Sequence, residues 1–344
     1  MASDAGLSRA TFAKLSPHPY LLANLNPSRD DVQPARSNGR APNEARPITV
    51  NLSSLSHPHG SSLVRMGDTT VICGIRGETL LTRDIANYRA SNSKSELWDY
   101  DLLVPNIEMA TGCAPQFLPG GPPTTLAQTL STRIYSLLHG SNLVQPDDLR
   151  IWHTRPSEHL VAEGDAMDED DENPSSQRAE AYVVAYWVLY IDIFFISFDG
   201  NPFDAAWAAT LAALRDTKIP RAHYDADREM ILCTRKDPTP LTIKSLPVAC
   251  TAVVFTGKET DRPSDGKFWL LVDPDNLEES LCDETVTIVV DCQEGNTRIL
   301  SVSKHGGVIL SSKMLRSEGL INWATERWKG VTSAIAGKEL GSVK

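Results

Sequence analysis

The side chains of this sequence that could bind or transform a ligand gather in two charged regions. Five cations recur in the first half of the chain: Arg65, Arg76, Arg83, Arg89 and Lys94. Four carboxylates lie close together in the second half: Asp273, Asp275, Glu278 and Glu279. Recurring cations could bind phosphate groups, and paired carboxylates could transfer protons or hold a metal ion. Each region also has a simpler interpretation, since acidic residues alternate with the cations and a solvated loop would explain the carboxylates.

The familiar signatures of catalytic and metal sites are missing. The sequence contains no G-x-S-x-G, Walker loop or H-E-x-x-H motif. Three histidines, His153, His159 and His223, are expected in loops and lack the spacing of metal ligands. The cysteines include no C-x-x-C pair, which favours buried free thiols in a reducing compartment over a zinc site. We therefore expect no metal and no cofactor.

One apolar stretch organises the elements that must position these charged groups. Residues 182–198 are rich in Val, Ile, Tyr, Phe and Trp, which favours one buried strand or two strands in succession. The stretch is nearly long enough for a membrane helix, but Asp192 interrupts it and no basic flank follows. A strand in a buried sheet is the better interpretation.

A helix is predicted directly after this strand. The turn Asp199-Gly200 precedes Asn201, which is expected to cap the helix, and Pro202, which suits a first turn. Apolar residues then recur at spacings typical of one buried stripe: Phe203, Trp207, Leu211 and Leu214. Ile219-Pro220 predicts the end of the helix. A buried strand leading into a helix rich in alanine predicts an α+β or α/β fold.

The length and net charge of the chain restrict the function further. The chain has 344 residues and a formal net charge of -11. Proteins that hold nucleic acid by bulk charge are usually basic, so any RNA contact must be local or shared with partners. The N-terminus has no apolar signal core, which predicts an intracellular protein.

The chain divides into an arm and two β-α halves of one domain. We expect an N-terminal arm over residues 1–31, a first β-α half over 32–220, and a second half over 221–344 that ends in a helix. The acidic run 168–172 predicts a flexible, solvated insertion over about residues 153–178. Docking of a basic partner is the alternative function of this run.

Three separated blocks of this sequence resemble a known family. An R-x-[DN]-G-R motif at residues 36–40 is followed by E-x-R-P and by GSSLVRMGDTTVICGIRGE. The later blocks are IDIFFISFDGNPFDAAWAATLAALRDTKIP and LLVDPDNLEESLCDETVTIVVD. In this order they resemble the RNase PH superfamily over roughly residues 32–330. The resemblance implies the RNase PH fold, α+β with two β-α halves, mixed sheets and packed helices (ribosomal protein S5 domain 2-like).

Within that superfamily the chain is most similar to ring subunits of the eukaryotic RNA exosome, in the class related to the non-catalytic archaeal ring subunit. Active members carry a D-G-G-T-R-T turn whose small residues and N–H groups hold phosphate at a helix start. The corresponding residues here are Asn201, Pro202, Phe203 and Asp204. Pro202 removes an N–H donor, and Asp204 places a carboxylate where an anion would bind. The resemblance therefore implies a degenerate phosphate site.

The carboxylates of active members are also only partly matched. Their two aspartates correspond to Leu277 and Asp283, and Leu277 can neither carry a proton nor bind a metal ion. An alignment shifted by one residue would instead bring Asp275 or Glu278 to the first position. Of the phosphate-binding arginines on the preceding helix only Arg133 remains. We therefore expect no catalytic residues, with an active phosphate-dependent 3′–5′ exoribonuclease as the alternative.

The resemblance implies a binding role in place of catalysis. The chain would be a structural subunit of a six-membered ring that threads RNA to a nuclease in another chain, in rRNA maturation and mRNA turnover. Arg83, Arg89 and Lys94 would face the pore and contact RNA. The implied partners are other RNase PH-like ring subunits, S1/KH-type cap subunits, the catalytic nuclease and RNA, without a membrane. The implied location is the nucleus, including the nucleolus, and the cytoplasm.

Overall fold

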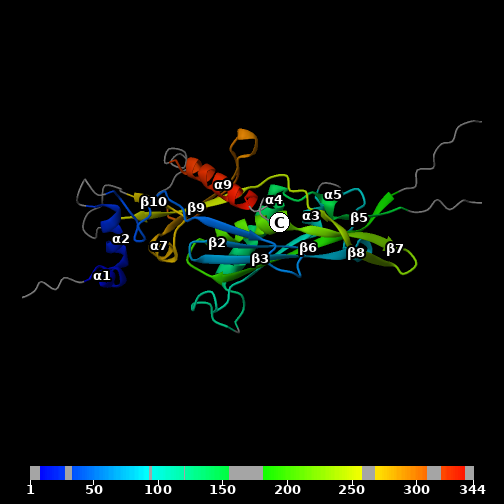
Figure 1. The fold of residues 1–344 in the computed structure, drawn as a ribbon, viewed down its shortest axis with the longest axis horizontal. Helices are drawn as coiled ribbons and strands as arrows, with labels where there is room; N and C mark the ends of the chain where they lie inside the picture. Colours follow the sequence, from blue (N-terminus) through cyan, green and yellow to red (C-terminus); the bar gives the residue numbers. More distant parts are fainter. Residues whose placement is uncertain are drawn as a thin grey trace, which may run out of the picture.

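Strand β6 (Ala181–Ser197) is the centre of the larger sheet, and the computed structural model shows it as one continuous strand. On one side it pairs antiparallel with β3 (Thr69–Leu81). On the other side it pairs parallel with β4 (Leu103–Glu108) and antiparallel with β5 (Arg150–Thr154). β2 (Gly60–Met66) and β1 (Ile48–Leu52) complete the sheet beyond β3 (Figure 1). The predicted buried strand is confirmed in its one-strand form.

The structure describes residues 8–27, 33–92, 95–119, 121–154, 181–257, 268–307 and 319–337. The acidic run 168–172, His159 and Lys94 lie outside the described residues. Among the described residues, no helix combines the length and apolarity needed to cross a bilayer.

Helix α6 (Pro202–Asp216) packs between the two halves of the chain. It contacts β2 and β3 of the larger sheet and β9 (Val248–Thr256) of the second sheet. Every residue from Pro202 to Leu214 is buried, which its alanines permit because small side chains allow close backbone approach. The predicted helix is confirmed, but it ends three residues before Ile219. Ile219-Pro220 lies instead in β7 (Lys218–Asp225), since the chain turns back into a strand directly after Thr217.

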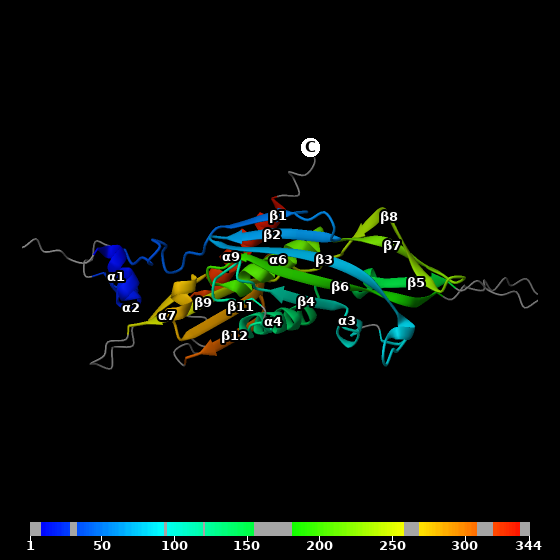
Figure 2. The ribbon, with the colours of Figure 1, turned by 90° about the horizontal axis from the view of Figure 1, so that it is seen from below.

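The second sheet has four strands in the order β10-β9-β11-β12. Its other members are β10 (Phe268–Val272), β11 (Glu284–Asp291) and β12 (Arg298–Gly306). Helix α9 (Leu320–Ala336), the helix predicted at the end of the second half, covers one face with Leu320 and Ala324. Helix α2 (Pro17–Leu25) packs against the other face with Leu21 and Leu25, and α1 (Arg9–Leu15) precedes it (Figure 2). The predicted arm therefore docks on its own chain.

The remaining elements are shorter or lie at the surface. They are η1 (Thr82–Asp84), α3 (Glu96–Asp99), α4 (Thr125–Ser141), α5 (Pro146–Leu149), α7 (Asn276–Leu281), η2 (Gln293–Gly295) and β8 (Met230–Pro240). Strands β7 and β8 form a separate two-stranded hairpin, which the sequence did not predict. Both sequence halves thus carry a sheet with packed helices, as an α+β fold requires.

Candidate functional site

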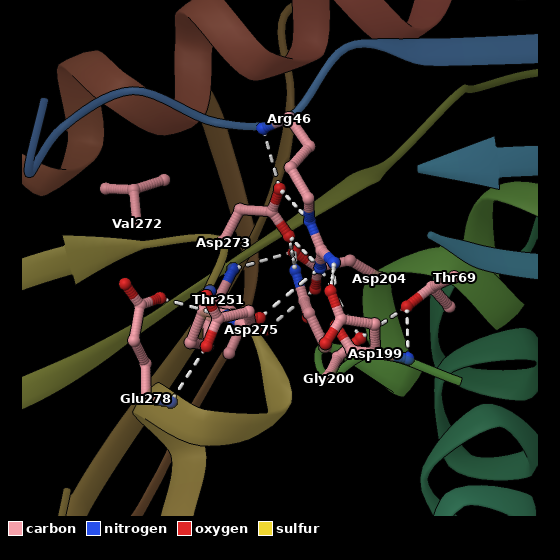
Figure 3. Close-up of polar contacts among 12 residues, drawn as sticks. Arg46, Thr69, Asp199, Gly200, Asp204, Thr251, Val272, Asp273, Asp275 and Glu278 are labelled. Atoms are coloured by element: carbon pink, nitrogen blue, oxygen red, sulfur yellow. Dashed lines mark hydrogen bonds and ion pairs between the residues drawn. The ribbon is translucent and has the colours of Figure 1, made fainter. Parts of the chain in front are cut away.

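An ion pair between Arg46 and Asp273 joins the two halves at the turn before α6. Arg46 precedes β1, and Asp273 directly follows β10 in a left-handed conformation with φ 52°. Arg46 Nη2 lies 2.8 Å from Asp273 Oδ1, Nε lies 3.0 Å from Oδ2, and the Arg46 backbone N–H also donates to Oδ2 at 2.7 Å (Figure 3). Both side chains are buried, so this is a bidentate pair held out of water.

The same guanidinium reaches three backbone carbonyls. Arg46 donates to the oxygens of Asp199 at 2.7 Å, Gly200 at 3.4 Å and Pro274 at 3.3 Å (Figure 3). Burial by itself raises the pKa of Asp273, but the hydrogen bonds and charge of Arg46 outweigh it and lower this pKa to about 2. The carboxylate therefore stays ionised, and one arginine ties the turn of the first half to the second sheet.

A second buried pair supports the first. Arg36 Nε lies 2.8 Å from Glu278 Oε1, Arg36 Nη2 donates to Oε2, and Nη1 donates to the Val272 oxygen at 2.7 Å. Glu278 also accepts from the Asp275 N–H at 3.0 Å, while Asp275 Oδ1 accepts from the Glu278 N–H at 2.9 Å. This reciprocal capping box starts α7. The interpretation of the acidic cluster as a solvated loop is wrong for Asp273 and Glu278, which are 1% and 0% exposed.

The turn before α6 is filled by its own chain. Asn201 stands at the N-cap with φ 49°, but its side chain does not cap the helix, so that prediction is wrong. Its Nδ2 instead donates to Asp204 Oδ2 at 3.0 Å and to Asp273 Oδ1 at 2.7 Å, since these buried carboxylates need donors more than the helix end does. Asp204 also accepts from the Thr251 N–H at 2.9 Å and the Thr251 hydroxyl at 2.7 Å.

These contacts use the Asn201 donors that could otherwise serve an anion at the turn. The Asn201 N–H donates to Glu279 Oε1 at 2.8 Å, and Pro202 has no N–H to offer. Burial raises the pKa of Asp204, and burial also raises the pKa of Glu279 to about 7 against the opposing pull of the Asn201 N–H and Arg46. In their ionised forms, Asp204 and Glu279 would repel a phosphate at this turn.

Phe203 and Arg133 lie on the other side of this turn. The Arg133 guanidinium carbon is 3.9 Å from the centre of the Phe203 ring, a cation–π contact, and Nη2 donates to the Thr287 hydroxyl at 3.0 Å. Both residues line a pocket of about 290 Å³ between α4, β11 and β12. Burial lowers the pKa of Arg133, opposed by the charge of Asp204.

The carboxylate positions and the histidines discussed from the sequence do not form a catalytic or metal site among the described residues. Leu277 lies on α7 with its side chain 40% exposed, and Asp283 is exposed in the turn before β11. Asp275 and Glu278, the alternatives from a shifted alignment, form the capping box of α7. His153 and His223 lie in β5 and β7, not in loops, and no metal-binding cluster occurs among the described residues.

The predicted RNA-binding arginines lie at the opposite end of the larger sheet. Arg83 is in η1, 56% exposed, and pairs with Glu229 at the tip of the β7–β8 hairpin at 3.0 Å. Arg89 is exposed in the following loop, where its backbone N–H donates to the Tyr100 hydroxyl at 3.1 Å. The two arginines share one surface loop, whose third predicted residue, Lys94, lies outside the described residues.

The sequence did not reveal three residues whose contacts fix the turn before α6. Arg46, Thr251 and Glu279 had no predicted role at this site, although Arg46 stands in the E-x-R-P motif and Glu279 in the acidic cluster. The position of Arg46 within a family motif was the signal that could have indicated its structural role. Its partner, 227 residues away, could not be identified from spacing.

Comparisons with known proteins agree with this fold and these motifs. Residues 44–220 match domain 1 of the 3′ exoribonuclease family (RNase PH), and residues 245–315 match its domain 2. The exosome complex component rrp43 of Schizosaccharomyces pombe is 30% identical over 89% of this chain and 90% of its own length. The exosome complex component Rrp42 of Archaeoglobus fulgidus is 25% identical over 86% of this chain and 87% of its own.

A solved structure has the same fold. A chain of the Archaeoglobus fulgidus exosome with RNA bound to the active site superposes with a TM-score of 0.62 at 23% identity, over 92% of this chain and 96% of that chain. The fold and motifs together define an RNase PH-type α+β protein. The chain belongs to the 3′ exoribonuclease (RNase PH) family.

The Arg46–Asp273 pair generates a prediction about stability. Asp273→Asn would leave the Arg46 guanidinium buried without its carboxylate, which costs about 3–5 kcal/mol of unfolding free energy. Urea unfolding of the full chain measures the loss. Asp227→Asn, in the exposed β7–β8 turn, is the matched control and should change stability by less than about 0.5 kcal/mol. Equal stability of the two variants would contradict the role given to the pair.

Glu279 generates a prediction about pH. Its pKa of about 7 lies above the ordinary 4.5, so between these values the folded chain binds more protons than the unfolded chain. Linkage then requires the Glu279 contribution to stability to be present below pH 4.5 and to be lost as pH rises toward 7. Relative to the parent chain, Glu279→Gln should therefore gain roughly 1–3 kcal/mol of unfolding free energy as pH rises across this window. Urea unfolding at both ends of the window tests it, and a pH-independent difference would refute it.

Proposed function

We propose that this chain is a non-catalytic structural subunit of the hexameric RNase PH-like ring of an RNA exosome. In this role it supports 3′–5′ RNA processing and degradation by guiding RNA toward a nuclease in another chain. The observation that carries the proposal is the filled turn at residues 201–204. The Asn201 N–H and side-chain amide serve Glu279, Asp204 and Asp273, Pro202 offers no N–H, and the carboxyl groups that line the turn are unfavourable for phosphate.

The described residues near the turn do not form a complete phosphorolytic site, which supports the same conclusion. Phosphorolysis needs phosphate held against the terminal phosphodiester and a carboxylate that assists proton transfer or metal placement. Near the turn, Asp273 and Glu278 instead pair with buried arginines, and Asp204 and Glu279 accept hydrogen bonds from Thr251 and Asn201. Leu277, the residue at the family's first carboxylate position, has no group that could replace them.

The names of the similar proteins indicate an assembly in which this chain could have the proposed role. The matched relatives carry the name exosome complex component, and the superposed structure is an exosome with RNA. We propose as partners other RNase PH-like ring subunits, S1/KH-type cap subunits, a catalytic nuclease and RNA. The corresponding location is the nucleus, the nucleolus and the cytoplasm, and the corresponding substrates are precursor rRNA and mRNA.

The first prediction concerns catalysis. Co-expression with sibling ring subunits should yield a stable heteromer in which this chain adds no phosphate-dependent release of nucleoside diphosphate from a short RNA. Size exclusion with light scattering measures assembly, and chromatography of released nucleotides measures phosphorolysis. Activity that survives when sibling sites are disabled, and is lost with Asp283→Asn, would establish the enzyme alternative.

The second prediction concerns the pore arginines. Arg83→Glu together with Arg89→Glu should weaken RNA binding and shorten the RNA segment protected from nuclease in the assembled ring, because two cations become anions. Filter binding and nuclease protection measure the effect. Arg298→Glu with Lys329→Glu, which reverses two exposed cations of the second half, is the control. Unchanged affinity and protection in the Arg83/Arg89 variant would refute a pore contact by these residues.

A further inference from the structure

The base of the β7–β8 hairpin carries cations that the proposed function has not used. Arg221, Arg235 and Lys236 are exposed there, and no ion pair joins them to a carboxylate among the described residues. Arg221 faces Thr234 in the strand register, directly before Arg235 and Lys236, so the three are neighbours across the hairpin. In a chain of net charge -11, such a group marks a local site for a polyanion.

Aromatic and proline residues form a groove beside these cations. The groove has a volume of about 360 Å³ between β5 and the hairpin base, and Arg221 lines it together with Trp152, Trp187, Pro220 and Pro240. Trp152 is 51% exposed, although it is large and apolar. An exposed indole at the wall of a groove of this size offers a plane on which a nucleobase could stack.

His59 lies next to the groove. Its ring is 6.3 Å from the Trp187 ring, and its backbone oxygen accepts from the Lys218 N–H at 3.0 Å. Burial, and then the positive charge of Arg235, lower the pKa of His59. Arg221 lines the groove itself, and Arg235 and Lys236 directly follow Thr234, the partner of Arg221 across the hairpin. Figure 1 shows β5, β7 and β8 together at one end of the molecule, away from α7 and the turn before α6.

The carboxylates in the groove are occupied by their own neighbours. Asp147 pairs with Arg150, whose guanidinium carbon lies 6.0 Å from the Trp152 ring centre. Asp148 accepts from the Thr242 N–H at 2.6 Å and from the Thr242 hydroxyl at 3.4 Å. Asp237 is exposed next to Lys236 and is the one further carboxylate of the hairpin base among the described residues. Asp148 keeps its charge in these contacts, so Arg150, Arg221, Arg235 and Lys236 stand against Asp147, Asp148 and Asp237, an excess of one cation among these residues.

We propose that this surface, defined by Trp152, Arg221, Arg235 and Lys236, binds single-stranded RNA outside the pore. The cations contact successive phosphates, and Trp152 stacks on one base. Single-stranded RNA fits better than an acidic protein segment because the groove combines cations with an exposed aromatic plane, and stacking accepts any base. The inference rests on the proposed function, since it places RNA on the assembled ring, but it assigns a contact separate from Arg83 and Arg89.

The experiment measures RNA affinity of the assembled ring against salt concentration, with a labelled oligouridylate as the probe. Arg221→Gln, Arg235→Gln and Lys236→Gln together should make the slope of log affinity against log salt shallower by about 2, because each single-strand phosphate contact contributes about 0.7. Trp152→Ala should weaken binding about tenfold with the slope unchanged, because stacking releases no counterions. Trp152→Phe should restore most of that loss.

The controls separate this proposal from the proposed function. Lys244→Gln, Arg298→Gln and Lys329→Gln remove three other exposed cations and should leave the slope unchanged. A ring that assembles and binds RNA with an unaltered slope in the hairpin variant overturns the RNA site and leaves the proposed function intact. Loss of a protein subunit from the hairpin variant, with RNA binding unchanged, shows that an acidic protein docks there and also overturns the site. Failure of the parent chain to assemble would instead overturn the proposed function.

Discussion

The buried Arg46–Asp273 pair is the constraint on which the junction of the two halves depends. A bidentate arginine pair out of water is stable only where its remaining donors are satisfied, and here three carbonyls from two segments meet that need. The backbones must therefore come very close. At Gly200, with φ 73°, an added Cβ would lie 2.4 Å from the carbonyl carbon of Asp275, so a side chain is excluded there. The turn, the end of β10 and the start of α7 are thus one packed unit.

This unit explains why a fold associated with nuclease activity can serve as a binding scaffold. A phosphate site at a helix start needs unsatisfied N–H groups and positive potential. Here Asn201 is turned inward, Pro202 lacks a donor and Asp204 is buried with Thr251 as its partner. The same residue types that disfavour phosphate add hydrogen bonds between the halves. Under the proposed function, stability at the junction and the lack of an anion site would be two consequences of one arrangement.

Local patterns predicted most of the fold and the family, but not the contacts across the junction. The apolar stretch around Tyr186 and the stripe of α6 depend on neighbours in sequence, and both were correct. The Asn201 cap was wrong because its competing acceptors are Asp204 in α6 and Asp273, which follows β10 and lies 72 residues away. The β7–β8 hairpin was not predicted because β8 is exposed along most of its length and lacks apolar alternation. The solvated-loop interpretation of Asp273 failed since only folding brings Arg46 to it.

Phosphate-specific stabilisation tests the central claim most directly. The melting temperature of the full chain, measured with inorganic phosphate and with chloride at matched ionic strength, reports any binding to the folded state. We expect no saturable, phosphate-specific rise in melting temperature beyond the gradual increase that phosphate gives as a kosmotropic salt, because Pro202 offers no N–H at the turn and carboxyl groups line it. A saturable rise that is larger in Asp204→Ala, which lacks one of these carboxyl groups, and unaffected by Arg133→Ala would show that phosphate binds at the turn, and would contradict this expectation.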